Sequence, residues 1–83
     1  MLRIHKIRLD GIYVPVKRKK TLDAARVQAL AEDMLMNGMK IPIQLRPVDG
    51  ARHVFVEGLH RLEAARSLGD TEIAAFLVQA QKH

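Results

Sequence analysis

Apolar and polar residues alternate along the middle of the chain with the two-residue period of a half-buried strand. Ile41, Ile43 and Leu45 each follow a polar residue or a proline, which predicts a strand with proline near its start. Asp49-Gly50 is a strong turn signal, and the apolar run 54–56 predicts the partner strand. The centre of the chain is therefore expected to form a β-hairpin.

Three more extended segments are expected towards the two ends of the chain. Residues 2–9 mix basic and apolar side chains, and residues 12–14 form a short extended piece after the turn signal Asp10-Gly11. Residues 73–78 are almost uniformly apolar. A strand that is apolar on both faces is typical of an internal position in a sheet, so we place 73–78 inside the sheet.

A helical period follows the first extended segments. Thr21 is the expected N-cap, Asp23 suits the first turn, and Asn37-Gly38 is a typical C-terminal stop. The apolar positions that recur at helical spacing, and that we expect to be buried, are Val27, Leu30, Ala31, Met34 and Leu35. The preceding run Lys17–Lys20 predicts a charged loop.

A second helix is predicted between the hairpin and the last strand. It begins at Gly58 and ends at Gly69, a residue type that commonly follows the last helical turn. The positions expected to face the core are Leu59, Leu62, Ala65 and Leu68. With 83 residues, the chain is expected to form one small domain.

Composition and charge narrow the function classes. The net charge of +5 favours an anionic partner, and the 4% of aromatic residues disfavours base stacking on aromatic platforms. The chain contains no cysteine, which excludes disulfides and cysteine-based zinc sites. No apolar run is long enough to span a membrane, so we expect a cytoplasmic protein with no membrane partner. A domain of this size has modest stability, which dimerisation would increase, and we expect a homodimer.

The start of the second helix concentrates the candidate chemistry. A helix N-terminus presents unpaired N–H groups and a partial positive charge. Gly58 has no Cβ and so would let a ligand approach the backbone, and His60 and Arg61 would add side-chain donors. We therefore predict a phosphate site at Gly58, Leu59, His60 and Arg61. The alternative is that Gly58 merely forms a tight turn and Arg61 pairs with a carboxylate at the surface.

Two blocks of sequence carry a family resemblance. Gly58-Leu-His-Arg-Leu-Glu-Ala64 resembles the glycine–basic–arginine–alanine box of ParB-type partition proteins. The segment from Val14 to Arg46 is similar to the same family in its order of basic segment, helix, glycine, Pro-Ile and strand. The resemblance runs from about Ile4 to Val78 and places the chain near the ParB/sulfiredoxin superfamily. It implies an α/β (α+β) domain over residues 1–83, with a small mixed sheet and two principal helices.

The resemblance also implies a ligand and residues that bind it. ParB-like domains bind a nucleotide, here expected to be CTP or ATP with Mg²⁺, and carry a basic residue facing its phosphates. Arg18 is our choice for that residue, since a guanidinium grips phosphate bidentately, and Lys19 is the alternative if the register differs by one. The competing interpretation is that residues 17–20 are simply a solvated charged loop.

Acidic residues near the box decide whether catalysis is plausible. Glu57 could hold Mg²⁺ bridged to phosphates and is the only catalytic candidate, whereas Glu63 is expected to pair with a basic neighbour. ParB proteins carry an acid directly after the box glycine, where this chain has Leu59. Sulfiredoxins resemble the same segment but place a reactive cysteine there, and their reaction requires a thiolate. Leu59 therefore excludes sulfiredoxin activity and leaves at most weak nucleotide hydrolysis.

Three histidines lie outside this segment. His5, His53 and His83 have no metal-ligand spacing and are expected to be ordinary surface residues.

The function implied by the resemblance is nucleotide binding in DNA partition or transcriptional regulation. The family's helix-turn-helix DNA reader is not found in these 83 residues, so we expect DNA binding only non-specifically or through a partner protein. One alternative is a ParB-fold phosphotransferase or nuclease-like enzyme, and we expect the chain not to be an enzyme. The other alternative is a basic module that binds the nucleic-acid backbone with steep salt dependence.

Overall fold

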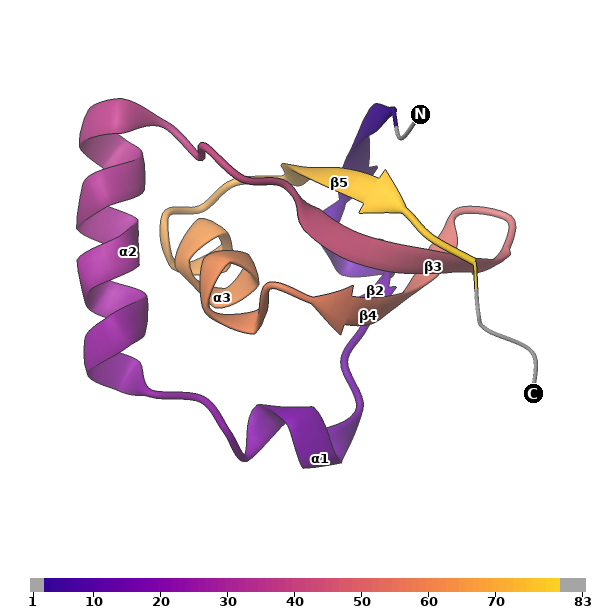
Figure 1. Cartoon of the computed structure of the whole chain (residues 1–83), viewed down its shortest axis with the longest axis horizontal. Helices are drawn as coiled ribbons and strands as arrows, with labels where there is room; N and C mark the ends of the chain where they lie inside the picture. Colours follow the sequence, from indigo (N-terminus) through magenta and orange to yellow (C-terminus); the bar gives the residue numbers. More distant parts are fainter. Residues whose placement is uncertain (1–2, 80–83) are drawn as a thin grey trace.

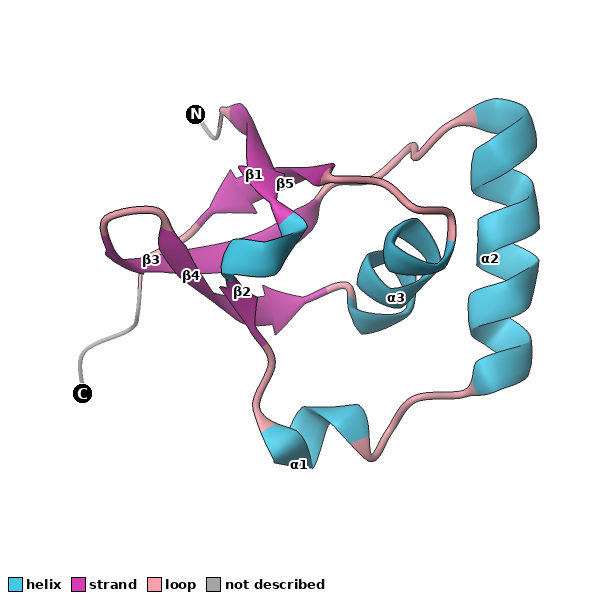
Figure 2. Cartoon of the chain, turned by 180° about the vertical axis from the view of Figure 1, so that it is seen from behind, coloured by secondary structure: helices cyan, strands magenta, loops and turns pink. Residues whose placement is uncertain are grey.

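The computed structural model describes residues 3–79, in which a five-stranded mixed sheet is covered by one helix and a second helix lies outside the first (Figure 1). Figures 1 and 2 both show α3 between the sheet and α2. In chain order the elements are β1 (Ile4–Arg8), a 3₁₀ turn (Leu9–Gly11), β2 (Ile12–Tyr13), α1 (Val16–Lys19), α2 (Ala24–Asn37), β3 (Ile43–Asp49), β4 (Arg52–Glu57), α3 (Leu59–Ser67) and β5 (Glu72–Leu77).

The sheet has the order β1-β5-β3-β4-β2, with β3 at its centre. β1 pairs with β5 and β3 with β4 in antiparallel fashion, whereas β5 with β3 and β2 with β4 run parallel. The predicted hairpin is confirmed, with Gly50 at a φ of 50° in its turn and Arg52 donating to the Asp49 carboxylate. The interior position predicted for the last strand is also confirmed, because β5 has a neighbour on each side.

The core lies between the covered face of the sheet and α3. Ile43 and Leu45 from the central strand and Leu62 from α3 are the largest side chains that are completely buried. The remaining buried apolar residues are Leu9, Ile12, Val14, Phe55, Leu59, Ala64, Ala65, Ile73 and Ala75. Aliphatic side chains thus supply most of the hydrophobic stabilisation, at roughly 25 cal/mol per Å² of apolar surface removed from water.

The long helix α2 is more exposed than its apolar stripe predicts. Val27, Leu30, Ala31 and Met34 are only half-buried, and Leu35 is 74% exposed. The expectation that this face is buried was therefore wrong for Leu35 and too strong for the others. The physical reason is that α2 packs mainly on α3, which lies between α2 and the sheet, so a narrow contact covers its stripe.

The segment before α2 also differs from its prediction. Residues 16–19 form a one-turn helix and not a loop, because the carbonyl of Pro15 accepts from the N–H groups of Arg18 and Lys19. The N-cap of α2 is Asp23, whose side chain accepts from the first-turn N–H groups. Thr21 is not the cap, because its hydroxyl donates to the carbonyl of Arg18.

Several smaller boundaries were shifted or wrong. The first strand begins at Ile4 within the described residues, and Leu2 lies outside them. β3 begins at Ile43, which leaves Ile41 exposed, and Leu68 is the half-buried C-cap of α3. His53 is buried and not a surface residue, and its Nδ1 lies 3.1 Å from the carbonyl oxygen of Ala51.

The prediction for His83 lies outside the described residues.

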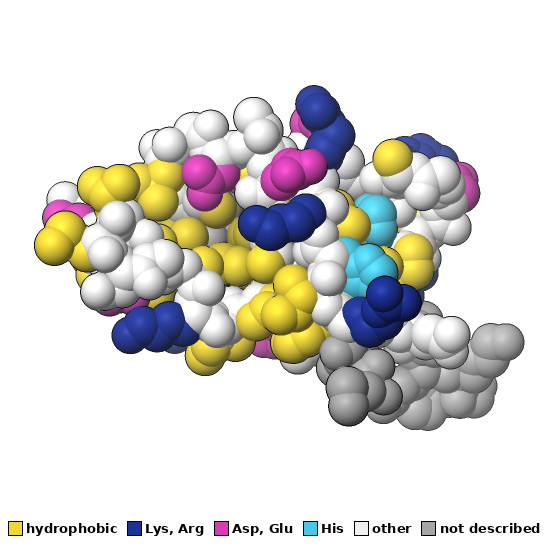
Figure 3. Space-filling model, turned by 90° about the horizontal axis from the view of Figure 1, so that it is seen from above, with side chains coloured by type: hydrophobic (Ala, Val, Ile, Leu, Met, Phe, Trp, Pro, Cys, Tyr) yellow, Lys and Arg dark blue, Asp and Glu magenta, His cyan; other side chains and the backbone are white. Residues whose placement is uncertain are grey.

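Seen from above, the molecule shows hydrophobic side chains that reach the surface between charged groups (Figure 3). Large exposed apolar side chains include Ile4, Leu35, Met36 and Ile41.

Candidate phosphate-binding site

The turn from β4 into α3 is built around Gly58. Its φ of 103° is a conformation that side-chain-bearing residues rarely adopt, and a Cβ there would lie 2.7 Å from Cγ2 of Ile43. Both facts require glycine at this position. The space beside the missing Cβ is filled by Ile43, so the glycine is required for packing on that side. The approach of a ligand to the Gly58 backbone stays a prediction, and it would come from the cavity that Gly58 lines.

A cavity of about 260 Å³ is bounded by this helix start. Its walls come from α1 and the turn that follows it, the first half of α2, the end of β4, and the turn into α3 with the first turn of that helix. The residues that line it are Arg18, Thr21, Arg26, Leu30, Glu57, Gly58, Leu59, His60 and Arg61. The structure therefore brings Arg18 together with Gly58 to Arg61, as the prediction of a shared site requires.

Arg18 is held at the cavity wall by two contacts. Its guanidinium donates to Oε1 of Glu57 over 2.7 Å and lies 5.1 Å from the centre of the Phe55 ring. A guanidinium over an aromatic face gains a cation–π attraction. The basic group of α1 is thus positioned by the end of β4, 39 residues further along the chain.

His60 has a different hydrogen-bonding role from the one expected. Its Nε2 accepts the backbone N–H of Asp23 over 3.0 Å. An imidazole that accepts at Nε2 carries its proton on Nδ1. One N–H of His60 therefore remains for a ligand, while the other ring nitrogen joins α3 to the start of α2.

Arg61 and Leu59 contribute in opposite ways. The Nε of Arg61 is buried and has no hydrogen-bond partner among residues 3–79. An unsatisfied buried donor costs about 1–3 kcal/mol, and other atoms of Arg61 line the cavity beside Arg18. The Leu59 side chain is part of the hydrophobic core, so only its backbone N–H can serve a ligand.

Arg26 was missed by sequence reasoning. It lies in the first turn of α2, within the helix that Asp23 caps, and it lines the cavity with Arg18 and Arg61. The sequence held no signal for it, because Arg26 reaches the cavity only through the packing of α2 against α3 and the hydrogen bond from Asp23 to His60. Three guanidinium groups thus line a cavity that contains one carboxylate, Glu57.

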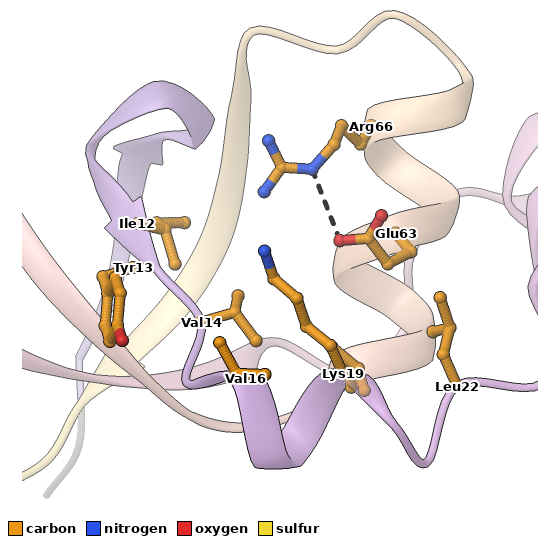
Figure 4. A pocket seen from close by; sticks show the side chains of 9 residues that line it. Ile12, Tyr13, Val14, Val16, Lys19, Leu22, Glu63 and Arg66 are labelled. Atoms are coloured by element: carbon orange, nitrogen blue, oxygen red, sulfur yellow. Dashed lines mark ion pairs between the residues drawn. The ribbon is translucent and has the colours of Figure 1, made fainter.

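Lys19 lies on a different cavity from Arg18. Figure 4 shows its amine pointing into a space of about 460 Å³ between β2 and α3. That cavity is bordered by the apolar side chains of Val14 and Val16 and by the ion pair of Glu63 with Arg66 at 3.4 Å. Adjacent residues of α1 therefore face two different cavities, and Arg18 is the one that faces the start of α3.

Among residues 3–79, neither the shifted pKa values nor the positions of potential metal ligands indicate a second functional site. The Arg8 guanidinium donates to Asp10 and lowers the pKa of that carboxyl, and Arg52 does the same to the pKa of Asp49. Both pairs lie away from the 260 Å³ cavity. Within residues 3–79, no group of three histidine, aspartate or glutamate side chains could hold a metal ion alone.

Comparison with known proteins gives the family to which the chain is similar. The family model for the ParB N-terminal domain matches residues 1–83. Sulfiredoxin of the chloroplast and mitochondrion from Arabidopsis thaliana is 33% identical over 66 residues, which cover 80% of this chain but only 52% of that protein. The chain therefore spans about half the length of this curated relative.

Solved structures show the same fold. The crystal structure of Arabidopsis sulfiredoxin matches with a TM-score of 0.82 and 28% identity, covering 94% of this chain and 86% of that one. Truncated ParB from Caulobacter crescentus, complexed with CTP-gamma-S, matches with a TM-score of 0.81 and 17% identity, covering 96% and 46%. A mutant free serine kinase in complex with ADP matches with a TM-score of 0.75 and 22% identity, covering 90% and 30%.

Proposed function

The chain belongs to the ParB N-terminal domain family, and we propose that its 260 Å³ cavity binds the phosphates of a nucleoside triphosphate, CTP or ATP. The single observation that carries this proposal is that Arg18 of α1 lines the same cavity as Arg61 in the first turn of α3. The chemistry of Arg61 supports it further, because a guanidinium at the cavity wall donates strongly to phosphate oxygens.

The size of the cavity limits what it recognises. Pockets for complete small molecules usually enclose about 300–1,000 Å³, so a space of about 260 Å³ fits a phosphate chain better than a whole nucleotide. The donors at its wall are guanidinium groups, one imidazole N–H and the N–H groups of a helix start. These donors recognise negative charge and not a base, so the preference between CTP and ATP must depend on contacts outside this cavity.

Two structural neighbours support a nucleotide as the ligand. ParB of Caulobacter crescentus was crystallised with CTP-gamma-S and the free serine kinase mutant with ADP. Both are below 25% identical to this chain, so they support the class of ligand through the fold and do not identify the base. We keep CTP and ATP as equal candidates.

Glu57 is the residue that fits Mg²⁺. Magnesium is usually bound through one or two carboxylates together with substrate phosphates, and Glu57 is the one carboxylate that lines the cavity. The bound metal would neutralise phosphate charge. We propose that Glu57 and the ligand phosphates would hold it together, since the described residues contain no complete metal site of their own.

The proposed role is binding and not catalysis. Leu59 occupies the position of the sulfiredoxin cysteine, and its side chain is buried in the core, so we do not propose sulfiredoxin chemistry despite the Arabidopsis relative. Of the described residues, Glu57 is the only acid that lines the cavity, and we propose at most weak nucleotide hydrolysis.

We place this module in DNA partition or transcriptional regulation, as a cytoplasmic homodimer. The support is the family match and the net charge of +5. We propose that DNA is contacted non-specifically or through a partner protein.

Among residues 3–79, no helix is long and apolar enough to cross a membrane.

Calorimetric titration with CTP, ATP, GTP, UTP and their monophosphates, each with and without Mg²⁺, tests the proposal. We expect a triphosphate to bind more tightly than its monophosphate in Mg²⁺, with little product formed in the same mixtures. Equal affinities for triphosphates and monophosphates would reduce the site to a general anion site. Rapid product formation would show that the module is an enzyme.

A further inference from the structure

In the free protein, the carboxylate of Glu57 is already hydrogen-bonded to the Arg18 guanidinium, which is the group that a phosphate would need. Its Oε1 accepts from the Arg18 guanidinium over 2.7 Å, and both residues line the proposed phosphate cavity. A guanidinium binds carboxylates and phosphates through the same planar donor geometry. Glu57 takes the Nη2 edge of Arg18, so a phosphate that binds this edge must compete with Glu57.

The pair is exposed enough to open. The Arg18 and Glu57 side chains are 42% and 62% exposed, and ion pairs at such positions contribute little net stability, about 0–1 kcal/mol. A multiply charged ligand can supply more than this through several donors at once. The contact is therefore weak enough for a ligand to displace, and in the free protein it positions Arg18 together with the Phe55 ring.

The same contact attaches α1 to the body of the domain. Helix α1 buries none of its own residues, so its attachment depends on the flanking chain and on the contacts of Arg18 with Glu57 and the Phe55 ring. Loss of the ion pair would leave only one of these two contacts. The position of α1 is therefore linked to the state of Glu57.

We propose that Glu57 is an internal competitor for the ligand's phosphate: it holds Arg18 and α1 against the sheet in the free protein and is displaced when a polyphosphate binds. This inference rests on the proposed function for its ligand. The consequence is a binding threshold. A ligand must carry enough negative charge to engage Arg61 and the start of α3 before it can take Arg18 from Glu57.

Two substitutions that remove the same charge separate this mechanism from a general electrostatic effect. Glu57→Gln removes the competitor. Glu63→Gln removes one negative charge from α3, but Glu63 pairs with Arg66 and lines the other cavity. Inorganic tripolyphosphate in EDTA is the probe, because it contains no base and the chelator removes any contribution from a metal.

We expect Glu57→Gln to bind tripolyphosphate about two- to five-fold more tightly than the parent, the range that an exposed ion pair allows. Glu63→Gln should change the affinity less than 1.5-fold, the size of a weak electrostatic effect. In an Arg18→Ala background the gain from Glu57→Gln should disappear. Equal gains for both glutamate variants, or a gain that persists without Arg18, would overturn the inference.

Limited digestion with trypsin tests the attachment of α1 without any ligand. Cleavage after residues 17–20 should be faster in Glu57→Gln than in the parent and in Glu63→Gln, as measured by mass spectrometry of the fragments. Equal cleavage rates would overturn the proposed hold on α1. If tripolyphosphate binds to no variant while cleavage still accelerates, the proposed function fails and the hold on α1 stands.

Discussion

The backbone N–H of Asp23 donates to Nε2 of His60 over 3.0 Å, and this hydrogen bond joins the start of α2 to the start of α3. Asp23 also caps α2 through its carboxylate. The contact brings Arg26, in the first turn of α2, to the cavity that α3 borders. His60 therefore positions a second helix at the candidate site, besides offering its remaining N–H.

The hydrogen bond between Asp23 and His60 can be tested directly. His60→Ala removes the acceptor and should lower the free energy of unfolding by about 0.5–1.5 kcal/mol, the net contribution of one hydrogen bond. His5→Ala is the control, because His5 is exposed on the edge strand β1. Urea unfolding measures both, and equal midpoints for the two variants would show that the contact contributes nothing.

The two helices should differ in their sensitivity to truncation. Leu62→Ala should destabilise the domain by about 2–5 kcal/mol, because Leu62 is completely buried. Leu30→Ala should cost less than about 2 kcal/mol, because Leu30 is only half-buried on α2. Denaturant unfolding of the two variants in parallel measures both costs. A lower midpoint for Leu30→Ala than for Leu62→Ala would contradict this packing.

Gly58 should not tolerate a side chain. Gly58→Ala imposes a φ of 103° on alanine and a 2.7 Å contact with Ile43, so we expect a loss of about 2–4 kcal/mol. Gly50→Ala is the matched control, since Gly50 also has a positive φ but nothing within 4 Å of the new Cβ. It should cost about 1–2 kcal/mol. Thermal or urea unfolding that ranked the two substitutions equally would remove the role assigned to Ile43.

Arg61 should matter for binding more than for folding. Arg61→Ala should weaken triphosphate binding by about 1.5–3 kcal/mol, the strength of a hydrogen bond to a charged group. Its free energy of unfolding should fall little, because the substitution also removes an unsatisfied buried donor. Arg66→Ala, on the same helix but at the other cavity, should leave affinity nearly unchanged. Identical affinities for these two arginine variants in calorimetry would exclude Arg61 from the site.

Much of the fold followed from local patterns that tertiary packing did not override. The hairpin at Asp49-Gly50 and the helix stop at Gly38 depend on turn and cap chemistry that the residues themselves specify. The exposure of Leu35 could not be predicted, because the pattern gives the direction of an apolar stripe and not the width of its partner. The single turn of α1 could not be predicted either, because it depends on hydrogen bonds to the Pro15 carbonyl and the run of basic residues carries no apolar pattern.

The residues of the candidate site also differ in whether the sequence could identify them. Gly58, His60 and Arg61 lie within four residues of one motif, so the sequence was enough to group them. Arg26 could not be found, because it reaches the cavity only once α2 lies against α3. The choice between Arg18 and Lys19 also needed coordinates, since adjacent residues of one helical turn point to different cavities.

We propose that Arg18 and Arg61 bind one polyphosphate ligand together. A double-mutant cycle of Arg18→Ala and Arg61→Ala, measured by calorimetric titration with the tightest-binding triphosphate in Mg²⁺, tests whether the two residues share the ligand. Residues that share a ligand should be coupled, and we predict an interaction free energy of about 0.5 kcal/mol or more between the two substitutions. Additivity within about 0.3 kcal/mol would contradict the shared site and return α1 to the role of a solvated basic segment.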